Sequence, residues 1–270
     1  MGKSITPVKL SLKEILIKSF GVVLIFVCWE IISHILPPSR LPSPSAVIGE
    51  LFGGLFSSTL ISSQGGGSKG LFPHLIYTIQ RWASGVMVGS FLGIVAGLVL
   101  GWSEKLRDFI EPPLETIRAI PPLVAVPFLL LWFGPGAFTQ FLVVVFFCFM
   151  RVVVFTVEAI NNVLLTQKQF ALTLGASRGL VFKTVVLPAI FPELIGGIRV
   201  VMASSWGIEV VAELMGSQSG VGRVFAFLIP VLAAKSIIAA ILWITIIAAM
   251  LDAIFVYFSR FLTKWVPENK

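Results

Sequence analysis

Long apolar stretches constrain the fold of this chain more than any other feature of its sequence. The stretch 82–102 contains no charged residue, and neither does 236–251. A helix of about 20 apolar residues is long enough to cross the hydrocarbon core of a bilayer. Hydrophobic residues make up 57% of the chain and charged residues only 12%, with a mean hydropathy of +0.99. These values predict an all-α integral membrane protein.

We expect six transmembrane helices. The first follows Lys3, Lys9, Lys13 and Lys18 and lacks a small-residue cleavage site, so it is predicted to be retained. Lys and Arg are concentrated in the segments placed on the cytoplasmic side, which predicts two cytoplasmic termini, 1–18 and 265–270. The net charge of +7 is therefore attributed to membrane orientation and not to a nucleic-acid partner. Within the transmembrane domain 19–264, the spans are expected at about 19–36, 77–102, 113–133, 138–164, 191–215 and 234–261.

Shorter elements are expected between these spans. Ser45–Phe56 is predicted to be a short amphipathic helix, and 57–70, rich in Ser and Gly, a flexible loop. The charged stretch 103–111 is expected to be a loop.

Glycines recur every four residues along the second span, at Gly85, Gly89, Gly93 and Gly97. This spacing leaves one helix face almost without side chains, so another helix can approach closely. We expect a tight crossing there, either within the protomer or between two copies.

The third span contains Pro112, Pro113, Pro121, Pro122 and Pro127. Proline inside a helix removes an amide donor and clashes with the preceding turn, so this helix is predicted to be broken. Irregular backbone at membrane depth is tolerated where it lines a water-filled cavity, which makes Pro121 and Pro122 candidates for a transport pathway. A simple kink is the alternative.

The polar and basic segment 166–188 interrupts two apolar spans. Thr166 and Gln169 have capping-box spacing and predict a helix that begins at Gln167. Gly175 is placed to end that helix in a left-handed conformation, and Ser177 to cap a second helix that stops before Pro188.

The residues provide no catalytic or metal-binding constellation. Cys28 and Cys148 lie singly in apolar runs, and His34 and His74 are isolated, so packing roles are favoured. The sequence contains no phosphate-binding GxxxxGK[ST] loop and no HExxH or GxSxG motif. The chain is therefore not expected to be an enzyme or to hydrolyse ATP itself.

The segment 166–188 resembles the cytoplasmic coupling loop of ABC importer permeases. Three further stretches, LPSPSAV, RAIPPLVAVPFLLLWFGPG and SQSGVGRVF, resemble permeases for taurine, sulfonate, nitrate and bicarbonate. The resemblance extends from Leu41 to Trp265. Gln169 and Phe170 stand where that family usually has Glu and Ala. The residues assigned to coupling are Gln169, Phe170, Ala171, Leu174, Gly175, Ser177, Leu187 and Pro188.

This resemblance implies a type I ABC importer permease fold in a bacterial inner membrane. It implies two ATPase subunits on the coupling helices, an extracytoplasmic binding protein, and a second permease subunit, usually an identical copy. ATP and Mg²⁺ would be bound by the ATPase, and no cofactor by this chain. The solute is expected to be a small anion or zwitterion such as taurine, another sulfonate, nitrate or bicarbonate; the sequence does not distinguish them. The alternative is a secondary transporter or channel without an ATPase, since broken helices and intramembrane charges also serve those proteins.

Further pathway candidates lie in the fourth and fifth spans. Met202, Trp206, Glu209 and Glu213 share one helical stripe. Trp206 is interpreted either as a gate or as a packing residue. Arg151, near the middle of its span, is predicted to pair with Glu209, because an isolated charge at that depth is costly; separate contacts with solute or solvent are the alternative.

Overall fold

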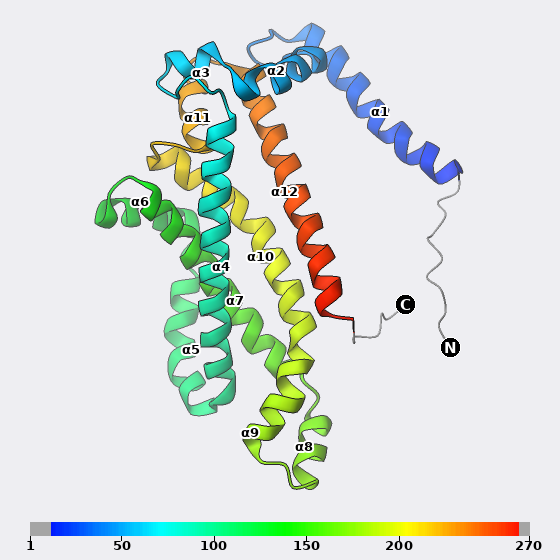
Figure 1. Cartoon of the computed structure of the whole chain (residues 1–270), viewed down its shortest axis with the longest axis vertical. Coiled ribbons are helices and arrows are strands. Elements are labelled where there is room, and N and C mark those ends of the chain that lie inside the picture. The colour runs from blue at the N-terminus through cyan, green and yellow to red at the C-terminus, as the bar shows by residue number, and fades with distance from the viewer. Residues whose placement is uncertain (1–11, 265–270) are drawn as a thin grey trace.

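The computed structural model describes residues 12–264, and every regular element in that range is a helix (Figure 1). The predicted cytoplasmic tail 265–270 and most of the N-terminal segment 1–18 lie outside the described residues. The helices are α1 (Leu12–Ile35), α2 (Pro44–Phe56), α3 (Thr59–Ser63), α4 (Phe72–Trp102), α5 (Glu104–Arg118), α6 (Pro122–Phe133), α7 (Ala137–Asn162), α8 (Leu165–Thr173), α9 (Arg178–Val181), a π-helical turn (Phe182–Val186), α10 (Leu187–Gly216), α11 (Val221–Leu228) and α12 (Ala234–Leu262).

Four helical stretches in the described part of the chain are long and apolar enough to cross a membrane. They are α4, α7, the continuous helix Arg178–Gly216, and α12. The pair α5 and α6 would add a fifth span, bent by 90° at its break. The six-span prediction therefore stays a prediction, although the broken third span is confirmed.

The glycine face of α4 packs directly on α7. A Cβ added at Gly85 would lie 2.7 Å from the Val144 side chain, and one added at Gly97 would lie 2.4 Å from Thr156. The residue numbers rise together along the contact, so α4 and α7 run in the same direction (Figure 1). The predicted tight crossing is confirmed as a contact within the protomer.

A buried polar network joins α4 to α10 and to the start of α11. Glu213, fully buried, accepts hydrogen bonds from Thr78 Oγ1 at 2.9 Å and from the Gly222 amide at 2.9 Å, and pairs with Arg81 Nη1 at 3.1 Å. Arg81 also donates to Ser217 Oγ and to the Ser219 carbonyl. This network satisfies a carboxylate that would otherwise be an unpaired charge in an apolar interior.

Polar contacts also attach the outer helices to the bundle. Arg199 on α10 makes a two-point ion pair with Asp252 on α12, with both N–O distances at 2.7 Å. The Trp243 indole on α12 donates to the Leu51 carbonyl of α2 at 2.8 Å, and the Trp29 indole on α1 donates to the Pro42 carbonyl at 3.0 Å. Figure 1 shows α1 standing away from the remaining helices.

Two of the expected loops contain helices. The stretch 57–70 includes α3, capped by Ser58 Oγ, which accepts from the Ile61 amide. The predicted loop 103–111 is wrong, because α5 begins at Glu104, capped by Ser103, and continues through Pro112 and Pro113. The carbonyls that lose their amide partners to these prolines belong to Asp108 and Phe109, and both residues are exposed.

We expect Gly89→Val to destabilise the subunit, because the added Cβ would lie 2.6 Å from the Val145 carbonyl oxygen. Overpacking of this kind costs about 1–3 kcal/mol. Thermal unfolding of the detergent-purified subunit measures the effect. Gly196→Val on α10 is the control, since its added Cβ has no neighbour within 4 Å. Equal unfolding midpoints for the two variants would contradict the tight crossing.

We expect Arg81→Met to be more harmful than the double variant Arg81→Met, Glu213→Gln. The single change leaves the buried Glu213 carboxylate without its cation, at a cost of about 3–5 kcal/mol, whereas the neutral amide keeps an oxygen for the Gly222 amide. The thermal midpoint of each variant is the measurement, with the exposed Arg40→Met as control. A double variant less stable than the single one would show that the charge balance is unimportant.

Candidate functional site

The helix pair α8 and α9 forms a turn at one end of the molecule, beyond the ends of α7 and α10 (Figure 1). Gly175 between them adopts a left-handed φ of +84°, as its position predicts. Ser177 Oγ caps α9 by accepting from the Leu180 amide at 3.3 Å, which is also as predicted. Phe170 and Leu174 are 67% and 72% exposed, so this end presents large apolar side chains outward.

The predicted capping box at Thr166 and Gln169 is wrong. α8 begins at Leu165 after Leu164, whose extended backbone separates it from the preceding helix, and no side chain caps it. Thr166 therefore lies inside the first turn, where its backbone is helical and it cannot serve as the cap. Gln169 is exposed and Ala171 is half-buried.

The predicted end of the second short helix before Pro188 is also wrong. A π-helical turn, Phe182–Val186, connects α9 to α10, and Pro188 occupies the first turn of α10. The wider π-helical turn changes the backbone register just before Pro188, where a proline would otherwise disrupt a continuous helix. Leu187 is half-buried and Pro188 is exposed. The turn bearing Gly175 is thus continuous with a membrane-spanning helix.

The break between α5 and α6 opens onto a cavity of about 500 Å³. Pro121 has an extended conformation, φ −59° and ψ 130°, and Pro122 starts α6. The residue before a proline is disfavoured in a helix, so two consecutive prolines separate the helices at this point. Pro121, Pro122 and Arg151 all line the cavity, as do Ser204 and Ile208 of α10. Three of the predicted pathway residues therefore come together.

The stripe on α10 lies on a different side of that helix. Trp206 stacks on Trp82 of α4 with ring centroids 4.3 Å apart, and Glu209 and Glu213 are fully buried inside the protomer. Met202 packs in the same cluster and borders a separate cavity of about 330 Å³ between α4, α10 and α12. Trp206 packs inside the protomer and also lines this cavity, so its interpretations as a gate and as a packing residue both stay predictions.

The predicted Arg151 to Glu209 ion pair is wrong. Arg151 faces the cavity at the break, with its guanidinium 5.9 Å from the Phe147 ring centroid, and has no ion-pair partner among the described residues. Glu209 faces the interior, one turn from Glu213, and its carboxylate oxygens have no hydrogen-bond partner in the described part of the chain. The prediction of a pair considered only the depth of the two residues along their helices. Their angular positions on α7 and α10 keep the two side chains apart.

Sequence reasoning missed the role of Arg81, which pairs with Glu213. Its place near the start of the second span suggests the membrane surface, although α4 begins at Phe72 and contains it. One signal in the sequence could have indicated this role. Thr78 and Arg81 are three residues apart and so share one helix face, and Arg81 lies one turn before Gly85, the first glycine of the contact face.

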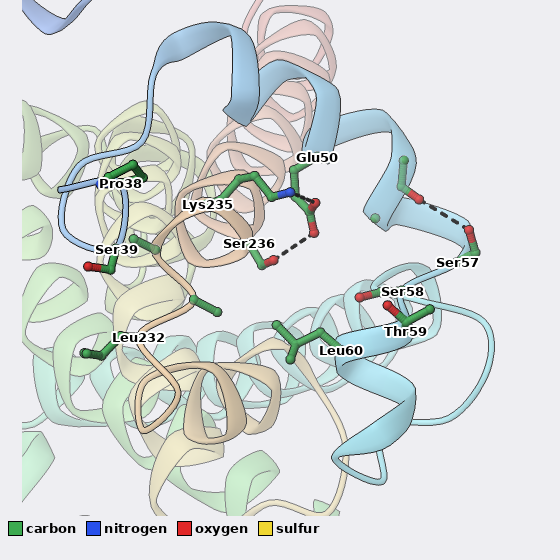
Figure 2. A pocket seen from close by; sticks show the side chains of 14 residues that line it. Pro38, Ser39, Glu50, Ser57, Ser58, Thr59, Leu60, Leu232, Lys235 and Ser236 are labelled. Atoms are coloured by element: carbon green, nitrogen blue, oxygen red, sulfur yellow. Dashed lines mark hydrogen bonds and ion pairs between the residues drawn. The ribbon is translucent and has the colours of Figure 1, made fainter. Parts of the chain in front are cut away.

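A second polar pocket lies at the opposite end of the molecule from α8 and α9, between α2, α3 and the start of α12 (Figure 2). Its volume is about 540 Å³. Glu50 lies between Ser236, whose hydroxyl donates to it at 2.7 Å, and Lys235, whose Nζ is 3.1 Å from its other oxygen. The charges of Glu50 and Lys235 in this pocket are thus balanced by their ion pair.

Comparison with known proteins identifies the family. The family described as binding-protein-dependent transport system inner membrane component matches residues 89–266. The taurine transport system permease protein of Escherichia coli K12 is 30% identical, over 91% of this chain and 88% of the relative. The putative aliphatic sulfonates transport permease protein of Bacillus subtilis 168 is 28% identical, over 89% and 84%.

Among solved structures, a chain of the MetNI methionine ABC transporter in an inward-facing conformation shares the fold. Its TM-score is 0.62 at 16% identity, and the match covers 72% of this chain and 96% of that one. The predicted type I importer permease fold is confirmed by this likeness. The family match covers most of the membrane-spanning helices. This chain therefore belongs to the binding-protein-dependent transport system inner membrane components, which are the permease subunits of ABC transporters, and it is a multi-pass transport subunit and not an enzyme.

Proposed function

We propose that this chain forms the translocation pathway of an ATP-driven importer for a small anion or zwitterion, such as taurine, another sulfonate, nitrate or bicarbonate. The turn of α8, Gly175 and α9 carries this proposal, because it presents apolar side chains beyond the end of the spanning helices. Its family favours an importer over the alternative, a secondary transporter or channel without an ATPase.

The exposed turn is suited to contact with an ATPase subunit. Two large apolar side chains, Phe170 and Leu174, are more than half exposed. They are four residues apart, so we expect them to present one apolar surface that fits a groove in the partner. Because α9 continues through the π-helical turn into α10, a displacement of the groove would be transmitted along a single helix into the membrane. ATP and Mg²⁺ belong to the partner in this proposal.

The cavity at the break supports the pathway assignment. It lies between α6, α7 and α10. Irregular backbone within a membrane is expected only beside protein or water. We propose Pro121, Pro122 and Arg151 as pathway residues, together with Ser204 and Ile208. A second copy of the chain would enclose the pathway from the other side.

Opposite roles follow for the two ends of the molecule. The α8 and α9 end would face the cytoplasm of a bacterial cell, together with both termini. The end carrying the pocket of Figure 2 would then face outward and receive the binding protein.

We expect Gly175→Val to uncouple ATP hydrolysis from uptake, because a β-branched residue is strained at φ +84° and the turn would change shape. Uptake by the complex assembled with its ATPase should fall at least tenfold while membrane insertion is retained. Gly179→Val in the same turn is the matched control, since its added Cβ meets nothing within 4 Å and its φ is ordinary. Normal uptake by Gly175→Val would remove the coupling assignment.

We expect Ser204→Cys to react with membrane-impermeant thiol reagents and Ser205→Cys to be at least tenfold slower. Ser204 lines the cavity, whereas the adjacent Ser205 is fully buried and receives the Trp82 indole hydrogen bond at 2.7 Å. Cys28→Ser removes the exposed native thiol; the other native thiol, Cys148, is buried. Labelling of intact membranes is the measurement. Equal rates for the two positions would show that this side of α10 lines no aqueous pathway.

A further inference from the structure

An arginine near the middle of a membrane-spanning helix faces the cavity at the break without a balancing carboxylate. Arg151 lies within about 2 Å of the midpoint of α7, counted at about 1.5 Å per residue. Its side chain is exposed, lines the cavity, and has no ion-pair partner among the described residues. Cations at that depth are costly and generally face a partner or water. The structure therefore leaves its charge directed into the cavity.

The other groups that line the cavity do not balance the charge of Arg151. Arg118 also lines it and is paired with Glu115 across one helical turn. Glu115 itself faces a neighbouring, smaller cavity of about 160 Å³, which also holds Glu111 and Glu158. No acidic side chain lines the larger cavity in the described part of the chain, where the remaining walls are apolar except for Ser204. Low-dielectric walls strengthen the field of an uncompensated charge.

We propose that Arg151 is an anion-selecting residue, and that the cavity between the α5/α6 break, α7 and α10 admits small anions in preference to zwitterions and cations. This rests on the proposed pathway function and narrows its solute class. The guanidinium offers several donors to an oxyanion such as a sulfonate, carboxylate or nitrate group. The Phe147 ring beside it holds the guanidinium toward the cavity by a cation–π contact. The buried Glu209 does not line this cavity and makes no ion pair with Arg151 in the described part of the chain.

The first experiment measures the field without requiring the solute or the ATPase. In the protein carrying Cys28→Ser and Ser204→Cys, reaction rates are compared for a negatively charged sulfonatoethyl and a positively charged trimethylammonioethyl methanethiosulfonate. Arg151→Gln should lower the ratio of the anionic reagent's reaction rate to that of the cationic reagent by about fivefold. Loss of one nearby positive charge slows the anionic reagent and speeds the cationic one. Arg151→Lys should keep the ratio. A ratio unchanged by Arg151→Gln overturns the anion proposal while leaving the pathway intact, whereas an introduced thiol that reacts with neither reagent contradicts both.

The second experiment distinguishes an anion from a zwitterion of similar size. Ethanesulfonate and taurine differ by one ammonium group, and each is added while the thiol introduced by Ser204→Cys is labelled with a neutral reagent. Ethanesulfonate should slow labelling more than taurine, and Arg151→Gln should abolish the difference. Equal protection by both compounds, or by tetramethylammonium, overturns the proposal.

The measurement is repeated in vesicles of phosphatidylcholine alone and in vesicles that also contain phosphatidylglycerol. Protection by ethanesulfonate that appears only without the anionic lipid would assign the site to a lipid headgroup and likewise overturn the proposal.

Discussion

The close approach of α4 to α7 determines the arrangement of the other helices. At Gly89 the two backbones leave no room for a methyl group, so four glycines spaced one turn apart allow a contact that any larger residue would prevent. Because these two helices run in the same direction, the chain must return across their full length between them. The bent pair α5 and α6 makes that return, and its break at Pro121 opens the cavity.

The orientation of α10 decides which of its residues reach this cavity. Glu213 is held by Thr78 and Arg81 of α4 and by the Gly222 amide, and the stack of Trp82 on Trp206 fixes the same side of the helix further along. With that side turned inward, Ser204 and Ile208 face the break. The buried charge network therefore fixes the rotation of α10 about its own axis and also satisfies the Glu213 carboxylate. A different rotation would expose that carboxylate or separate it from Arg81.

Sequence patterns were reliable where the cause is local. Gly175 adopts the left-handed conformation that its position after a short helix predicts, and Ser177 caps the helix that follows. They failed where two local causes compete. Thr166 has the spacing of a cap, but α8 already begins one residue before it. Pro112 and Pro113 resemble a helix break, yet α5 continues through them. The break between α5 and α6 lies at Pro121 and Pro122, where a proline also precedes the first turn of the next helix.

The sequence by itself determined the membrane class, the glycine contact face, the broken third span and the turn at Gly175, because each depends on composition or on spacing along one helix. The tertiary structure alone decided the partners of the charged residues within the membrane-spanning helices. Arg151 and Glu209 have suitable signs and depths for a pair, but their separation depends on the rotation of α7 and α10 about their own axes. That rotation is set by contacts with α4, whose glycines from Gly85 to Gly97 pack against α7 and whose Arg81 pairs with Glu213 of α10. No pattern within a single helix encodes these contacts.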